Sequence, residues 1–158
     1  MKNIKVRDFA LKFLRESITA VVATSTTDGN PHAAVIYFYV DDDFNFYFLT
    51  AHNTRKYENL MQNPKISLTV GFGPPYITIQ GRGKAELLEN NSDEESAAIV
   101  KIDKRLYSKD YRWPLFEISR FKNEKLYVFK IIPSELTLLN LDKDNNLTTY
   151  RDDFQKII

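Results

Sequence analysis

The sequence predicts a mainly β protein with flanking helices, folded as a closed or nearly closed antiparallel barrel. Aromatic residues, which are favoured in strands, make up 13% of the 158 residues. At least six runs rich in β-branched and aromatic residues are separated by short polar turns, and helical patterns are few. Closing the sheet into a barrel would remove the free edges that such strands otherwise expose.

The first part of the chain is predicted to form a helix and then a three-stranded meander. Residues 4–16 carry apolar side chains at helical spacing and basic side chains on the other face. Three apolar runs follow, joined by a turn at Asp28-Gly29 and by a run of three aspartates. These runs are predicted to be consecutive antiparallel strands, at residues 18–25, 33–40 and 44–50.

A short helix is predicted after the third strand and extends to about Met61. Asn53 or Thr54 can cap it, because either side chain can accept a hydrogen bond from a free N–H of the first turn. Asn63-Pro64 ends it, since the residue before a proline avoids helical angles.

The remaining elements follow from turn signals and hydrophobic pattern. Gly81 and Gly83 lie on one face of a long strand, where glycine permits a bend or a close approach by another group. Ser92 and Glu95 have the spacing of a capping box and should begin a helix. The predicted segments are strands at 65–72 and 76–89, a helix at 92–109, an irregular region or short helix at 110–123, a strand at 125–141 interrupted by Pro133, and a short polar tail.

Length and composition limit the possible functions. One domain spanning residues 1–158 is expected from the length. The absence of cysteine excludes disulfides, thiolate metal ligands and cysteine nucleophiles, and two histidines are a poor supply of ligands, so no metal site is expected. A net charge of +1 gives no support for nonspecific nucleic-acid binding. With no apolar run of about 20 residues and no apolar signal core, we expect a cytoplasmic protein without a membrane partner.

The start of the short helix is the candidate binding site. Arg55 and Lys56 stand in its first turn, beside the hydroxyl residues Thr50 and Thr54. A helix N-terminus carries about half a positive charge and several unpaired N–H donors, so cations are unfavourable there. Either solvent or an external anion must offset the repulsion, and the cluster therefore predicts an anion site such as one for phosphate, with a solvated turn as the alternative. The glycine-rich nucleotide motifs are absent.

The order of these pieces resembles a known family. The segment DGNPHAAVIYFYVDDDFNFYFLTAHNTRKYENLMQNPKISLTV, followed by ITIQGRGKAELLE and LYVFKIIPSELTLLNL, is similar to the pyridoxamine 5'-phosphate oxidase-like flavoproteins. The resemblance covers about residues 18–141 and implies the FMN-binding split-barrel fold, an antiparallel split β-barrel. It also implies a homodimer with FMN at the subunit interface.

The resemblance assigns roles to individual residues. It implies that Thr50, Thr54, Arg55 and Lys56 hold the FMN phosphate. It implies that one strand lies along the flavin and bonds the ring through its backbone, at Ala34, Val35, Ile36 and Tyr37. Leu49 would line the same wall, and Thr78 would contact the flavin. Trp113 is either a core or interface anchor or a ring lying over the flavin.

The implied activity is that of an FMN-dependent oxidoreductase acting on a small-molecule substrate. No acid–base pair or nucleophile stands out, which suits a reaction whose hydride chemistry belongs to the flavin. The tail NNLTTYRDDFQKII has one arginine and no histidine, unlike the segment by which enzymes oxidising pyridoxamine phosphate grip their substrate, so that literal activity is not expected. The alternatives are a non-enzymatic flavin-binding or storage protein, and a split barrel that uses haem or a deazaflavin.

Overall fold

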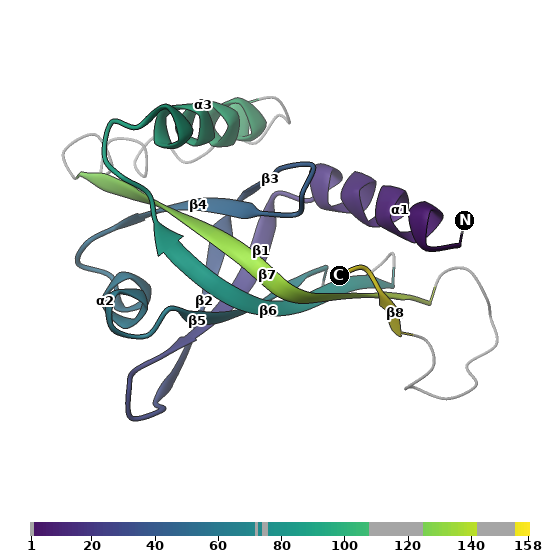
Figure 1. Cartoon of the computed structure of the whole chain (residues 1–158), viewed down its shortest axis with the longest axis horizontal. Coiled ribbons are helices and arrows are strands. Elements are labelled where there is room, and N and C mark those ends of the chain that lie inside the picture. Colours follow the sequence, from purple (N-terminus) through teal and green to yellow (C-terminus); the bar gives the residue numbers. More distant parts are fainter. Residues whose placement is uncertain (1, 72, 74–75, 108–124, 142–153) are drawn as a thin grey trace.

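The computed structural model describes residues 2–71, 73, 76–107, 125–141 and 154–158 (Figure 1). The helices in these ranges are α1 (Lys2–Glu16), α2 (Arg55–Gln62) and α3 (Asp93–Tyr107). The strands are β1 (Thr19–Ser25), β2 (Pro31–Tyr37), β3 (Tyr39–Val40), β4 (Phe46–Ala51), β5 (Lys65–Val70), β6 (Ile77–Leu87), β7 (Leu126–Asn140) and β8 (Phe154–Lys156). None of the described helices has both the length and the apolar character needed to cross a lipid bilayer.

The eight strands form one curled antiparallel sheet, which confirms the expected split barrel. The strand order is β2-β1-β5-β6-β7-β4-β3, and β8 pairs with β7. The two outermost strands, β2 and β3, are consecutive in the chain and are separated only by Phe38. Because one residue joins the two ends of the sheet, the sheet must curl back on itself. Phe38 is only 2% exposed, so its ring lies in the core at the point where the barrel closes.

The predicted simple meander is wrong, because the expected strand at 33–40 divides at Phe38. Its first part, β2, pairs with β1, and its last part, β3, pairs with β4. An apolar run shows that its residues are extended and buried, but it does not show which neighbour each residue pairs with. The predicted polar tail is also wrong, because β8 adds to β7 and the following Ile157 is buried in the core.

The long strands β6 and β7 depend on two glycines, as the sequence predicts. A Cβ atom added to Gly83 would lie 2.1 Å from the carbonyl oxygen of Ile132, and one added to Gly81 would lie 2.4 Å from a methyl group of Leu136. The register shifts between Arg82 and Gly83, which is opposite Pro133. The bulge lets β7 continue past a proline that would otherwise interrupt it.

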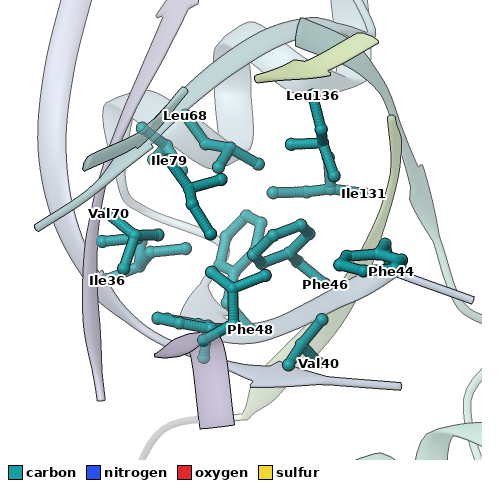
Figure 2. Close-up of a cluster of buried hydrophobic side chains, with 14 of the residues drawn as sticks. Ile36, Val40, Phe44, Phe46, Phe48, Leu68, Val70, Ile79, Ile131 and Leu136 are labelled. Atoms are coloured by element: carbon teal, nitrogen blue, oxygen red, sulfur yellow. The ribbon is translucent and has the colours of Figure 1, made fainter. Parts of the chain in front are cut away.

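The barrel interior is an apolar core rich in phenylalanine. Figure 2 shows side chains from several strands converging in it: Ile36, Val40, Phe44, Phe46, Phe48, Leu68, Val70, Ile79, Ile131 and Leu136. Alternation along β4 sends Tyr47 and Leu49 to the outer face instead, where they join a second cluster with Ala98 and Ile102 of α3. The helix α3 lies across β4 and β7 in Figure 1 and covers this outer cluster.

Candidate functional site

The candidate site is built at the junction between β4 and α2. Thr54 is the N-cap, with extended backbone angles, and its Oγ1 accepts a hydrogen bond from the Tyr57 N–H at 3.4 Å. The Thr54 hydroxyl also donates to the Ala51 carbonyl oxygen at 3.0 Å, and the Thr50 and Thr54 hydroxyl oxygens lie 2.8 Å apart. Since Thr50 is only 3% exposed, this contact ties a buried strand end to the first turn of the helix.

Two cations follow this cap without an acidic partner. Arg55 is exposed and Lys56 is partly buried. Among the described residues the ion pairs are Arg15–Asp42, Arg82–Glu135 and Lys130–Glu94, so neither Arg55 nor Lys56 is neutralised within them. Burial lowers the pKa of the Lys56 ammonium, because the charged form loses hydration. A bound anion would supply the charge compensation that the described part of the protein lacks.

The free edge of the sheet runs along β2. The Phe38 N–H donates to the Ile18 carbonyl oxygen, and the Thr26 N–H donates to the Asn30 carbonyl oxygen. The peptide groups of the even-numbered residues of β2 therefore point toward β1. The odd-numbered positions, including Val35, therefore direct their peptide groups away from β1. No described strand pairs with β2 on that side. Val35 is 63% exposed, whereas Ile36 is buried in the core and, at an even-numbered position, directs its peptide group toward β1.

The helix α2 lies beside the β1–β2 hairpin, so the cations and the free edge belong to one side of the barrel. It packs against both strands. The Asn59 amide donates to the Thr24 hydroxyl at 3.0 Å, and the Asn63 amide donates to the Ser25 hydroxyl at 3.0 Å. Sequence reasoning missed Thr24 and Asn59, since no local pattern relates two residues on different elements 35 positions apart.

The other predicted site residues lie elsewhere. Leu49 packs in the cluster beneath α3. As its neighbour on β4, Thr50 lies on the opposite face of the strand. Thr78 stands near the start of β6, where its hydroxyl donates to the Gly71 carbonyl oxygen at 3.5 Å. Figure 1 shows β6 beginning near β8, on the side of the molecule away from α2. Trp113 lies outside the described residues.

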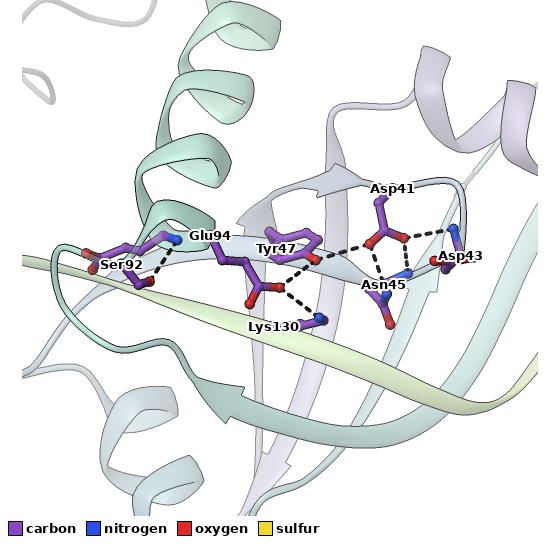
Figure 3. A network of polar contacts seen from close by, with 8 residues as sticks. Asp41, Asp43, Asn45, Tyr47, Ser92, Glu94 and Lys130 are labelled. Atoms are coloured by element: carbon purple, nitrogen blue, oxygen red, sulfur yellow. Dashed lines mark hydrogen bonds and ion pairs between the residues drawn. The ribbon is translucent and has the colours of Figure 1, made fainter.

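A second polar cluster lies on the outer face of the barrel, at the base of α3 (Figure 3). The Tyr47 hydroxyl lies 3.1 Å from carboxylate oxygens of both Asp41 and Glu94, and Lys130 pairs with Glu94 at 2.8 Å. Burial, together with these two carboxylates, raises the pKa of the Tyr47 hydroxyl. The hydrogen bond from Lys130 lowers the pKa of Glu94. These contacts attach α3 to β4 and β7, a structural role.

Comparisons with known proteins agree with this architecture. A family model described as pyridoxamine 5'-phosphate oxidase matches residues 6–136. A pyridoxine/pyridoxamine 5'-phosphate oxidase from Trichormus variabilis is 32% identical over 81 residues, which are 51% of this chain and 38% of that relative. The match thus spans well under half the length of the relative.

Solved structures share the fold. HutZ, a haem storage protein from Vibrio cholerae, superimposes with a TM-score of 0.64 at 18% identity, over 82% of this chain and 89% of that chain. A pyridoxamine 5'-phosphate oxidase-related, FMN-binding protein from Nostoc punctiforme superimposes with a TM-score of 0.58 at 15% identity, over 89% of this chain and 83% of that chain. The two neighbours differ in the ligand that their names give, so the shared fold alone does not select a cofactor.

Proposed function

The chain belongs to the pyridoxamine 5'-phosphate oxidase family, and from this premise we propose that it is an FMN-binding flavoprotein. In this proposal it acts as a homodimer with FMN at the subunit interface and as an oxidoreductase on a small-molecule substrate. The observation that carries the proposal is the pair of cations at the start of α2, of which Lys56 is partly buried without a carboxylate partner among the described residues.

A phosphate group suits this pair of cations. The phosphate of FMN is a dianion, and Arg55 and Lys56 together supply two positive charges beside the free N–H groups of the α2 N-terminus. The Thr50 and Thr54 hydroxyls are already oriented toward each other at the same point. In the proposed complex the two cations bind the phosphate, Thr54 caps the helix, and Thr50 fixes the position of the cap.

The free edge of β2 offers backbone hydrogen-bonding groups to the flavin ring of FMN. A flavin carries hydrogen-bond donors and acceptors along one edge, and the peptide group of Val35 is directed to the side of β2 that no described strand occupies. Ala34, Ile36 and Tyr37 continue the same strand. Bound FMN would supply the electron-transfer chemistry, while this chain binds the phosphate, orients the ring and shields it from water.

The position of Thr78 supports a dimer in this proposal. Both are expected at the flavin, yet in one chain Leu49 lies beneath α3 and Thr78 lies near the start of β6. A second copy of the chain would bring its own Thr78 to a ring bound on the first, whereas Leu49 lies beneath α3 in each copy. It would also cover the outer face of a flat ring that one barrel leaves open.

Haem storage is the alternative that a structural neighbour suggests. A haem iron needs an axial ligand, and histidine is a common one. The chain has two histidines: His52 is exposed at the end of β4, with its ring 6.4 Å from that of Tyr127, and His32 lies on β2.

The test is an absorption spectrum of the purified protein, followed by titration of the cofactor-free chain with FMN and with riboflavin. We expect a flavin spectrum, and we expect FMN to bind far more tightly than riboflavin, which has the ring but no phosphate. A haem or deazaflavin spectrum, or equal affinity for the two flavins, contradicts the proposal. Turnover with NAD(P)H then separates an oxidoreductase from a storage protein.

A further inference from the structure

Two buried polar side chains hold α2 against β1. Thr24 is 3% exposed and Asn59 is 7% exposed, and the Asn59 amide donates to the Thr24 hydroxyl at 3.0 Å. The Thr24 hydroxyl lies 3.5 Å from the His32 carbonyl oxygen, to which it donates. A hydrogen bond inside a packed seam adds little net stability compared with two well-packed apolar groups. Its particular property is that it is directional.

Asn59 lies one helical turn after the two cations of α2. It follows Lys56 by three residues and Arg55 by four, so all three side chains leave the same side of α2. Leu60 anchors α2 in the barrel core, and the Tyr57 ring packs on those of Tyr127 and Phe129. At the C-terminal end of the helix, the Asn63 amide donates to the Ser25 hydroxyl at 3.0 Å. Apolar contacts are non-directional and tolerate a small rotation of the helix about its axis. The bond to Thr24 does not.

Thr24 also belongs to the hairpin that carries the free edge. It is paired with His32, two residues before Ala34 on β2. The Asn59–Thr24 bond therefore connects the helix that carries the cations to the hairpin that carries the strand expected along the ring. The Asn63–Ser25 bond makes a second connection at the C-terminal end of the helix. A ligand that places its phosphate on α2 and its ring on β2 needs the two elements at a fixed separation and rotation.

We propose that Thr24 and Asn59 are positioning residues, which set the rotation of α2 so that Arg55 and Lys56 meet the phosphate while the flavin ring lies along β2. This inference rests on the proposed function, because it requires a ligand with both a phosphate and a ring. Neither residue needs to touch the ligand. The contribution of Thr24 and Asn59 to affinity therefore acts through the contact with the phosphate, and it is absent for a ligand that lacks a phosphate.

The test compares a variant that removes the bond with one that keeps it. Thr24→Val combined with Asn59→Leu replaces both partners with apolar groups, a change that can be nearly neutral for folding. Thr24→Ser keeps the hydroxyl and is the matched control, and Thr137→Val controls for a threonine-to-valine change on a strand remote from α2. The full chain, freed of bound flavin, is titrated with FMN and with riboflavin, and its thermal unfolding is measured separately.

The readout is the ratio of the riboflavin to the FMN dissociation constant. We expect the double variant to lower this ratio about fivefold, the equivalent of one neutral hydrogen bond, with riboflavin affinity unchanged. Both controls should keep the wild-type ratio. If wild type has a high ratio and the double variant keeps it, or loses FMN and riboflavin affinity equally, the positioning role is wrong and the proposed function stands. If the wild-type ratio is near one, the phosphate site itself is wrong and the inference fails with it. A lowered melting temperature with an unchanged ratio shows a structural role only, which also overturns it.

Discussion

At the scale of single residues, the central feature is a lysine that is partly buried without a carboxylate partner among the described residues. Lys56 follows the N-cap of α2, where the helix dipole disfavours a positive charge. Its pKa is lowered by burial alone, with no neighbouring acid among the causes. The charged Lys56 thus lowers the stability of the empty protein, and a bound anion should stabilise its charge more than it stabilises that of the exposed Arg55. Arg55, exposed beside it, adds a second charge at lower desolvation cost.

Removing either cation should weaken FMN binding and leave riboflavin binding unchanged. Each charge-assisted contact to phosphate is worth roughly 1.5–3 kcal/mol, so Lys56→Ala and Arg55→Ala should each raise the FMN dissociation constant roughly ten- to a hundredfold. Fluorescence titration of the flavin-free protein measures this. Lys12→Ala removes an exposed lysine of α1 and serves as the control. Full FMN affinity in both site variants would mean that the cluster is only a solvated helix start.

The lowered pKa of Lys56 also predicts a pH dependence. The ammonium must be charged to bind phosphate, so FMN affinity should be complete below the pKa of Lys56 in the empty protein. It should begin to fall at a pH below the ordinary lysine value of 10.5. In the same window the empty protein should become more stable as pH rises, because the unfolded chain binds the proton more tightly than the folded one. Titrations at stepped pH with wild type and Lys56→Ala check this; identical pH profiles for the two would contradict it.

At the scale of elements, the pairing of β6 with β7 depends on the absence of two side chains. Gly83 lies at the register shift, and its added Cβ atom would lie 2.1 Å from backbone oxygen, a contact that no rotamer change relieves. The bulge there also accommodates Pro133 inside a strand of 15 residues. These two strands connect the β1–β5 side of the sheet to β4, which carries Thr50.

Gly83→Ala should therefore destabilise the protein markedly. Overpacking of this kind costs about 1–3 kcal/mol, and more where backbone must move. Urea unfolding followed by circular dichroism measures the free energy of unfolding. Gly73→Ala is the matched control, because a Cβ atom there meets nothing within 4 Å. An equal effect of the two substitutions would show that the close approach at Gly83 is not what requires glycine.

At the scale of the whole molecule, the barrel is split because the two end strands of its sheet, β2 and β3, do not pair with each other. Phe38 joins β2 to β3, while the free edge of β2 remains unpaired among the described strands. An unpaired edge with an exposed Val35 beside it is a surface that proteins usually cover. In the proposed dimer, the ligand and the second copy cover it together.

The proposed assembly predicts the mass in solution. Light scattering of the flavin-loaded protein at micromolar concentration should give about twice the chain mass of 18.4 kDa. The dimer should weaken when flavin is removed, since the ring forms part of the interface in this proposal. A mass near 18.4 kDa with flavin bound would rule out a site shared between two subunits.

The sequence by itself determined the features that depend on neighbours along the chain. The cap at Thr54, the two cations after it and the Thr50 hydroxyl lie within seven residues, so helix-terminus physics relates them directly. The roles of Gly81 and Gly83, the Ser92 hydroxyl that accepts from the Glu95 N–H at 3.1 Å, and the mainly β class were predictable for the same reason.

Only the tertiary structure decided how distant segments meet. The break at Phe38, the pairing of the tail with β7, and the Asn59–Thr24 bond all join residues that no local pattern relates. The same holds for Leu49, whose apolar character predicts burial but not which face of β4 it occupies relative to α3. Local propensities depend on a few adjacent residues, whereas pairing partners depend on how the whole sheet curls to bury its core. The helix cap and the two cations after it were therefore predictable from one segment, and the packing of α2 against the β1–β2 hairpin was not.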